Sequence, residues 1–178
     1  MNITIFGGAQ PAPGSPAYQE AYNLGKLLAE AGHTILTGGY LGTMEAASRG
    51  ASEAGGHVIG VTCEEIERWR GNKPNAWIKD ERRFDTLRER LNALIDGCQA
   101  AIALPGGPGT LAEIALVWNL MIVVTASPKL LILVGAGWRS VFDEFFRSFD
   151  AYIPGKQRKL LLFAPDVQTA MKLLESRE

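Results

Sequence analysis

The chain has 178 residues, with 47% hydrophobic residues, 21% charged residues and a formal net charge of −1 at pH 7. This composition is typical of a globular protein long enough to bury a core, so we expect one domain over residues 1–178. The nearly balanced charge argues against a protein that binds nucleic acid or an anionic membrane through a broad basic surface.

The first third of the chain alternates between short β-rich runs and helical patterns. Gly32 ends the first predicted helix, because glycine readily adopts the left-handed conformation that follows a helix. Strands and helices that alternate over short connections favour a parallel sheet with helices on both faces. The predicted elements are a strand at residues 2–6, a helix from Ser15 or Pro16 to Gly32, a strand at 34–37, a helix at 43–54 and a strand at 57–61.

The rest of the chain begins with its least regular part, residues 64–80, which we expect to form either a lid or specificity loop or a plain surface excursion. Four arginines, Arg82, Arg83, Arg88 and Arg90, surround the start of the next helix, and most should lie on its solvated face. The predicted elements are a helix at 84–95, a strand at 100–104, a helix at 114–124, a strand at 129–134, a helix at 140–149, a strand at 159–163 and a helix at 166–175.

The predicted helix at residues 114–124 is apolar almost all round, so it has to be buried on every side. Another subunit is the natural cover, which predicts a homodimer or an assembly of dimers. No apolar run reaches membrane-spanning length, no secretory leader precedes the first strand, and Cys63 and Cys98 lack the spacing of a metal site. We therefore expect a cytoplasmic protein without membrane contact, metal or cofactor.

A glycine-rich loop joins the apolar run at residues 100–104 to the helix after it. Glycines let a backbone turn tightly and approach a bound group closely. Thr110 can cap the helix, whose free N–H groups then face a phosphate, and Glu113 brings a carboxylate to the same place one turn later. The loop lacks the spacing of a P-loop or a dinucleotide fingerprint. The predicted phosphate-binding residues are Pro105, Gly106, Gly107, Gly109 and Thr110.

Two further glycine loops also follow predicted strands, at Gly7-Gly8 and at Gly38-Gly39. The carboxyl ends of parallel strands meet at one edge of a sheet, which is where α/β proteins bind their ligands. We therefore expect Gly8, Gly38 and Gly39 to take part in the same nucleotide site.

The string Pro105-Gly106-Gly107-x-Gly109-Thr110-x-x-Glu113 resembles the signature of the LOG family of phosphoribohydrolases. The similarity covers nearly the whole chain, including the Phe6-Gly7-Gly8 turn and the loop at residues 37–44. The resemblance implies a Rossmann-like α/β/α fold of three layers with a mostly parallel sheet, and a homodimer. It also implies cleavage of the N-glycosidic bond of a nucleoside 5′-monophosphate, which yields a free base and ribose 5-phosphate. By the same match, Arg90 corresponds to the family's catalytic arginine and Glu113 to its catalytic glutamate.

Four residues depart from the family pattern around the nucleotide: Ala9, Tyr40, Glu45 and Leu91. They leave two hypotheses open, a phosphoribohydrolase and a carrier that binds a nucleotide or a pterin-type cofactor without catalysis. A lysine decarboxylase is not supported, because the sequence shows no recognisable lysine context for pyridoxal phosphate. A protein that binds single-stranded DNA would need a basic and aromatic surface that is not evident here.

The proposed chemistry depends on Glu113 and Arg90. Departure of a base from C1′ builds positive charge on the sugar, which the Glu113 carboxylate can stabilise, although it can equally orient the ribose hydroxyls or activate water. Arg90 can hold the phosphate or the ribose. The alternative for Arg90 is a surface ion pair with Glu89 or Asp96.

Overall fold

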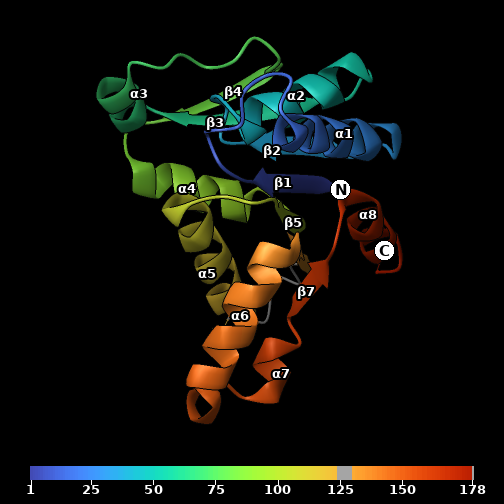
Figure 1. Cartoon of the computed structure of the whole chain (residues 1–178). Helices are drawn as coiled ribbons and strands as arrows, with labels where there is room; N and C mark the ends of the chain where they lie inside the picture. The colour runs from blue at the N-terminus through green and yellow to red at the C-terminus, as the bar shows by residue number, and fades with distance from the viewer. Residues whose placement is uncertain (124–129, 178) are drawn as a thin grey trace.

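The computed structural model describes residues 1–123 and 130–177, in which seven parallel strands form one sheet in the order β4-β3-β2-β1-β5-β6-β7 (Figure 1). The strands are β1 (Asn2–Phe6), β2 (Thr34–Thr37), β3 (Val58–Cys63), β4 (Asp80–Phe84), β5 (Ala100–Ala103), β6 (Leu130–Val134) and β7 (Leu161–Ala164). The helices are α1 (Pro16–Glu30), α2 (Thr43–Glu53), α3 (Glu64–Arg70), α4 (Leu87–Asp96), α5 (Pro108–Val123), α6 (Ala136–Ser148), α7 (Gly155–Arg158) and α8 (Val167–Glu175), with a 3₁₀ turn, η1, at Asp150–Tyr152.

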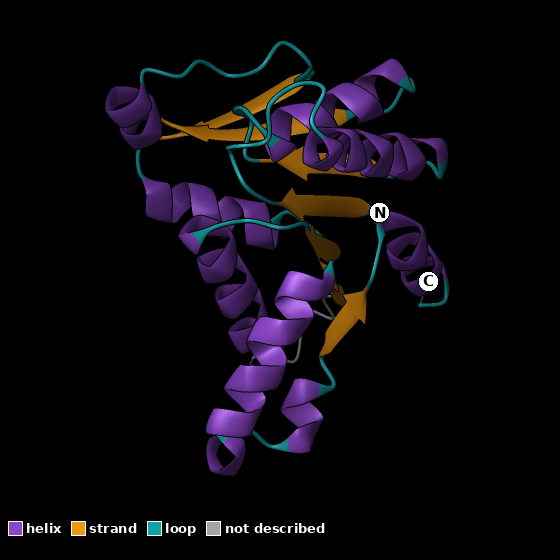
Figure 2. Cartoon of the chain, viewed as in Figure 1, coloured by secondary structure: helices purple, strands orange, loops and turns teal. Residues whose placement is uncertain are grey.

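Helices cover both faces of the sheet, so the expected three-layer α/β/α fold with a parallel sheet is confirmed (Figure 2). Helices α1, α2 and α8 pack on one face, and α4, α5 and α6 pack on the other. The central strand β1 contributes to both cores, because successive side chains of a strand point to opposite faces. It buries Ile3 and Ile5 on the first face and Phe6 on the second.

Helices α1 and α2 cross with their backbones in contact. A Cβ added at Gly25 in α1 would collide with the carbonyl of Ala47, and one added at Gly50 in α2 would collide with the carbonyl of Tyr22. Glycine at both positions therefore permits this approach. The crossing brings together the two glycine loops that immediately precede these helices.

The predicted element order is largely confirmed, with the largest errors between residues 64 and 87. Residues 64–70 form α3, and β4 adds a fourth strand to the half of the sheet that contains β1. Four of the five residues of β4 are charged and exposed, so they lack the alternation by which a strand is recognised. Charged side chains suit this position because β4 is the edge strand, where they discourage pairing with another chain.

Several helix boundaries also differ from the prediction. Helix α4 begins at Leu87, three residues later than expected, because Thr86 and Glu89 form a capping box there. Helix α5 begins at Pro108, so Thr110 is its third residue and the prediction that Thr110 caps this helix is wrong. Helix α6 begins at Ala136, four residues earlier than predicted, and α7 was missed. The predicted end of the helix at residue 124 and the predicted start of the strand at residue 129 lie outside the described residues.

Helix α5 is buried along one side only. Ile114 and Val117 are fully buried, whereas Leu111 is 43% exposed and Val123 is 64% exposed. The single chain thus leaves part of this apolar helix uncovered. Among the described residues, no helix combines the length and the apolar composition that a membrane span requires.

Candidate functional site

The three glycine loops meet at the carboxyl edge of the central strands. The N–H of Gly8, after β1, donates to the carbonyl of Pro105, after β5, at 3.1 Å. The carbonyl of Gly8 accepts from the N–H of Thr43, the first residue of α2, at 2.9 Å. Gly42 has a φ of +69° and lies so close to Ala9 that a Cβ would collide with its backbone. The sheet order reverses between β1 and β5, which is the point where open α/β sheets bind ligands.

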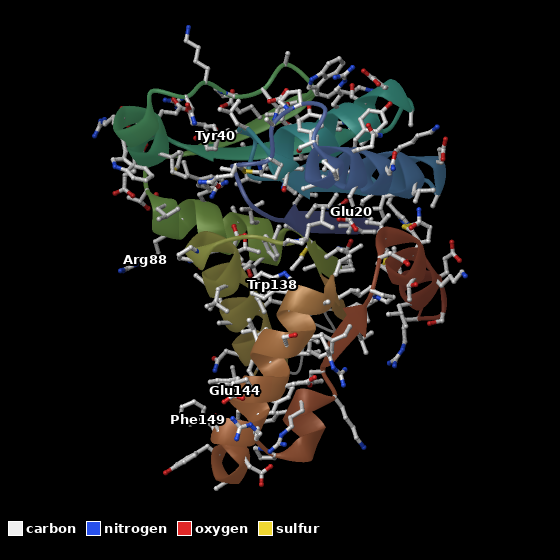
Figure 3. The ribbon with its side chains drawn as sticks, in the orientation of Figure 1. Glu20, Tyr40, Arg88, Trp138, Glu144 and Phe149 are labelled. Atoms are coloured by element: carbon white, nitrogen blue, oxygen red, sulfur yellow. The ribbon has the colours of Figure 1, made fainter. Side chains whose placement is uncertain are left out.

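Arg90 reaches this edge from α4, and it is only 6% exposed. Its Nε donates to the carbonyl of Val61 at 2.8 Å, and its Nη2 donates to the carbonyl of Gly38 at 2.9 Å. A Cβ at Gly38 would collide with Nη2, so glycine is required for this approach. The alternative of a surface ion pair for Arg90 is wrong. Arg88, on the same helix, does lie on the exposed surface (Figure 3).

Glu113 lies on α5, which neighbours α4 (Figure 1), and its side chain is partly buried. Burial raises the pKa of the Glu113 carboxyl to about 7, and the positive charge of Arg90 opposes this rise. The two residues matched to catalytic positions therefore lie on neighbouring helices, and their charges interact. A carboxyl group that titrates near neutral pH can both accept a proton and carry a negative charge under physiological conditions.

The glycines of the third loop divide into two kinds. Gly106 is required by packing, because a Cβ there would collide with the Thr110 side chain and approach the N–H of Gly8. Gly107 and Gly109 have no positive φ, and nothing lies within 4 Å of a Cβ added at either position. The protein's own packing and backbone therefore do not require glycine at these two positions. Residues 105–109 are exposed, whereas Thr110 is buried beneath them.

Three of the four departures from the family pattern have clear surroundings in the structure. Glu45, in the first turn of α2, accepts a hydrogen bond from the hydroxyl of Tyr18 at 3.2 Å. Leu91 packs against the core under α4, α5 and α6, and Ala9 is partly exposed beside Gly42. None of these three residues lies within 4 Å of a Cβ added at Gly107 or Gly109.

The sequence interpretation missed Asn75, which lies in the irregular segment between α3 and β4. Its N–H donates to the carbonyl of Gly39 at 2.8 Å, and its Nδ2 donates to the carbonyl of Tyr40 at 3.0 Å. This segment is therefore fastened to the second glycine loop. A single asparagine among other loop residues carries no local pattern that could have revealed this contact.

A cavity of about 370 Å³ lies at the carboxyl ends of β6 and β7. It adjoins the glycine-rich loop, because a Cβ added at Gly135 would lie 3.6 Å from Cγ of Pro105. The guanidinium carbon of Arg139 lies 4.9 Å from the centroid of the Phe163 ring. The cavity is lined by Gly135, Ala136, Arg139, Phe163, Ala164 and Pro165.

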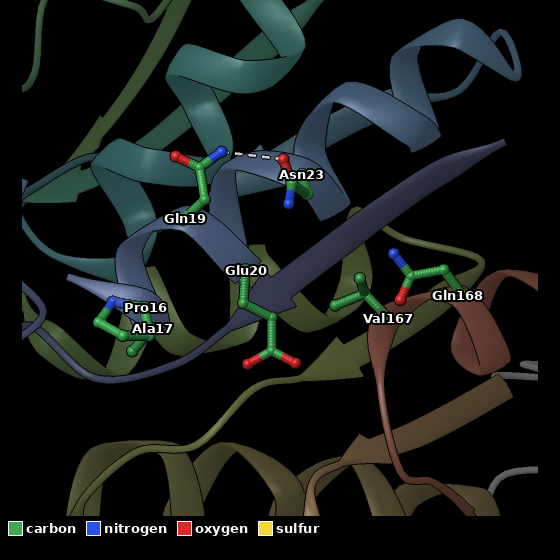
Figure 4. Close-up of a pocket in the computed structure, with 7 residues that line it drawn as sticks. All are labelled: Pro16, Ala17, Gln19, Glu20, Asn23, Val167 and Gln168. Carbon is green, nitrogen blue, oxygen red and sulfur yellow. Dashed lines mark hydrogen bonds between the residues drawn. The ribbon is translucent and has the colours of Figure 1, made fainter. Parts of the chain in front are cut away.

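A more open groove of about 530 Å³ runs between α1 and α8 (Figure 4). Burial, together with the charge of Asp166, raises the pKa of its Glu20 carboxyl. None of the predicted site residues lines this groove. Within the described residues, no group of three or more His, Cys, Asp or Glu side chains is arranged to hold a metal ion.

Comparison with known proteins gives one family match and several distant relatives. Residues 1–137 match the model of the SLOG cluster4 family. The cytokinin riboside 5′-monophosphate phosphoribohydrolase LOG of Oryza sativa subsp. japonica is 29% identical over 182 residues, covering 97% of this chain and 72% of that protein. Its counterpart LOG7 of Arabidopsis thaliana is 26% identical over 181 residues, covering 99% and 82%. The expected similarity to LOG proteins is confirmed.

Solved structures with the same fold include proteins that are described as binding or carrying the molybdenum cofactor. The molybdenum cofactor binding protein of Rippkaea orientalis is 25% identical with a TM-score of 0.74, covering 98% of this chain and 95% of that one. The molybdenum cofactor carrier protein of Chlamydomonas reinhardtii is 28% identical with a TM-score of 0.74, covering 98% and 96%. DNA processing protein A of Helicobacter pylori, at 14% identity and a TM-score of 0.63, shares the fold alone, covering 99% and 81%.

Proposed function

We propose, starting from the fact that the chain belongs to the SLOG cluster4 family, that it hydrolyses the N-glycosidic bond of a nucleoside 5′-monophosphate. The observation that carries this proposal is the electrostatic interaction of Glu113 with Arg90, which binds the Gly38 loop, together with the rise of the Glu113 pKa to about 7. Relatives named as phosphoribohydrolases support the same reaction class.

In the proposed reaction, the phosphate lies on residues 106–110, against the N–H groups at the start of α5. The ribose then faces Glu113. As the bond from C1′ to the base breaks, positive charge builds on the sugar, and the ionised Glu113 carboxylate stabilises it. Water supplies the hydroxyl group to C1′, and the base leaves with a proton. Arg90 holds the Gly38 loop by its carbonyl and favours the ionised form of Glu113.

The direct test is base release from the 5′-monophosphates of adenosine, guanosine, cytidine and uridine, followed by chromatography. The four nucleosides without phosphate are the matched controls, because a site that grips phosphate should leave them intact. We expect release from at least one monophosphate and from none of the nucleosides. Tight binding of monophosphates without any release would reject the hydrolase.

Such a result would favour the second candidate, a carrier of a phosphate-bearing small-molecule cofactor. The observation in its favour is the cavity of about 370 Å³ beside Pro105, which extends the carboxyl edge beyond the glycine-rich loop. It offers room for a ligand larger than a nucleoside monophosphate. Two structural relatives are described as proteins that bind or carry the molybdenum cofactor.

Substitution of Gly109 tests the position of the phosphate. Gly109→Ala should leave folding intact or stabilise α5 by up to about 1 kcal/mol, because the site has space and no positive φ. It should nevertheless weaken nucleoside monophosphate binding by about tenfold, since the methyl group would stand where the phosphate lies. Calorimetric titration and thermal unfolding measure the two effects. Gly155→Ala, equally open in α7, is the control, and equal affinities in all three proteins would contradict this position.

Helix α5 leads us to propose a homodimer. The exposed apolar side chains of Leu111 and Val123 are the kind of surface that a second copy covers. Light scattering at micromolar concentration should give twice the mass of the chain, and Val123→Arg should lower that mass. Val141→Arg, at a comparably exposed position on α6, is the control. A monomer mass for the unmodified protein would rule out the dimer.

A further inference from the structure

Tyr40 replaces a glycine of the family pattern in the second glycine loop, yet its side chain does not lie over the loop. It is only 1% exposed. Its hydroxyl accepts a hydrogen bond from the N–H of Cys63 at 2.8 Å and donates to the carbonyl of Cys63 at 2.9 Å. The ring is therefore buried, with its hydroxyl at the end of β3.

The backbone groups that Tyr40 binds belong to the side of β3 that faces β2. The carbonyl of His57 accepts from the N–H of Ile35 in β2, and residues two apart in a strand face the same way. Val61 and Cys63 therefore also face β2. However, the ladder between these strands ends at the pair Thr37 and Gly60, where β2 turns into the glycine loop. The carbonyl of Val61 and both backbone groups of Cys63 lie beyond this last pair.

Two side chains bind these backbone groups where the pairing with β2 has ended. Arg90 Nε donates to the carbonyl of Val61, and the Tyr40 hydroxyl binds both the N–H and the carbonyl of Cys63. The two side chains also touch each other, since the guanidinium carbon of Arg90 lies 5.6 Å from the centroid of the Tyr40 ring. Arg90 is thus held between backbone carbonyls and an aromatic ring that is itself fastened at its hydroxyl.

We propose that Tyr40 is a positioning residue that fixes Arg90 beside Glu113; its effect on turnover rests on the proposed hydrolase function. A glycine at this position has no side chain with which to hold the arginine. The tyrosine supplies a ring against the guanidinium and a hydroxyl for the end of β3. Asn75 completes the arrangement by binding the carbonyl of Tyr40 itself.

The experiment compares Tyr40→Leu and Tyr40→Phe with the same two substitutions at Tyr22. Tyr22 is a close match, because its hydroxyl donates to Glu53 at 2.7 Å and its ring lies 5.9 Å from the guanidinium carbon of Arg49, away from the site. Tyr40→Leu removes the ring and the hydroxyl, and kcat should fall by about a hundredfold, the cost of a misplaced catalytic group. Tyr40→Phe keeps the ring, and kcat should fall by about tenfold. KM should change less than kcat, and the Tyr22 variants should match the unmodified protein.

Two readouts separate positioning from a general loss of stability. The first is the NMR titration of the ¹³C-labelled Glu113 carboxyl, whose pKa should rise above about 7 in Tyr40→Leu as the opposing charge of Arg90 moves away. The second is Tyr40→Leu in an Arg90→Ala background, which should lower kcat no further, because Tyr40 acts through Arg90.

An unchanged Glu113 titration and unchanged kcat per folded molecule in both Tyr40 variants would reduce Tyr40 to a core residue and overturn the proposal. If Tyr40→Leu does not fold, Tyr40→Phe decides by the same measurements. If the unmodified protein hydrolyses no nucleotide, the hydrolase proposal has failed. The Glu113 titration still decides whether Tyr40 fixes Arg90, because it requires no turnover.

Discussion

Glu113→Gln is expected to lose most base release and, at the same time, to make the protein more stable above neutral pH. Glutamine keeps the size and hydrogen bonding of the side chain but removes the negative charge that faces the cationic sugar in the transition state. Loss of one such electrostatic partner typically lowers kcat by about a hundredfold or more. Nucleoside monophosphate binding should remain, because the phosphate is held by α5 and its loop.

The gain in stability follows from the pKa of Glu113. Burial raises it from 4.5 to about 7, so the folded state binds the proton more tightly than the unfolded state does. A raised pKa contributes stability at low pH that is lost as the pH rises from about 4.5 through about 7. In Glu113→Gln the side chain does not ionise, so this decrease in stability with rising pH is absent. The variant should match the original protein at pH 4 and exceed its free energy of unfolding by up to about 3 kcal/mol at pH 8.

Base release and denaturant unfolding at several pH values measure the two effects on the same samples. Glu144→Gln, at an exposed glutamate on α6, is the control and should leave base release unchanged (Figure 3). If Glu113→Gln lowers neither base release nor the pH dependence of unfolding, Glu113 is neither catalytic nor buried in solution. Loss of base release accompanied by loss of stability at every pH would indicate a folding defect instead.

Arg90→Ala is expected to lose both turnover and stability, unlike Glu113→Gln. The substitution leaves the buried carbonyls of Val61 and Gly38 without their donor, at about 1–3 kcal/mol each. We therefore expect the free energy of unfolding to fall by about 2–5 kcal/mol. Turnover should fall by about a hundredfold or more, because the charge beside Glu113 and the anchor of the Gly38 loop are lost together.

Arg90→Lys separates the contribution of the positive charge of Arg90 from that of its hydrogen bonds. Lysine keeps the positive charge but has no planar guanidinium with which to reach the two carbonyls, so it should restore little stability. The control is Arg88→Ala, at an exposed position on the same helix, which should change neither property. Stability close to that of the original protein in Arg90→Ala would contradict the role of Arg90 as a buried anchor.

The sequence by itself determined the features that depend on neighbouring residues. Alternation of apolar strands with helical patterns gave the parallel three-layer fold, and most core elements were predicted within a few residues. Each glycine loop was found at the end of a strand, because glycine in that place marks a sharp turn whatever surrounds it. The family motif also pointed to Arg90 and Glu113, which the fold brings to the same edge.

Only the tertiary structure decided the features that depend on contacts between distant segments. Strand β4 is recognisable by its pairing with β3, since its own charged sequence resembles a surface loop. Arg90 has the local pattern of a solvated helix residue, and it is buried because strand β2 ends early and leaves carbonyls for it to bind. Tyr40 likewise departs from the family pattern, and its use emerges only from Cys63 and Arg90, which lie 23 and 50 residues further along the chain. A local pattern determines where a chain turns. The position of a buried polar side chain depends instead on the backbone groups with which it forms hydrogen bonds, and these belong to distant segments.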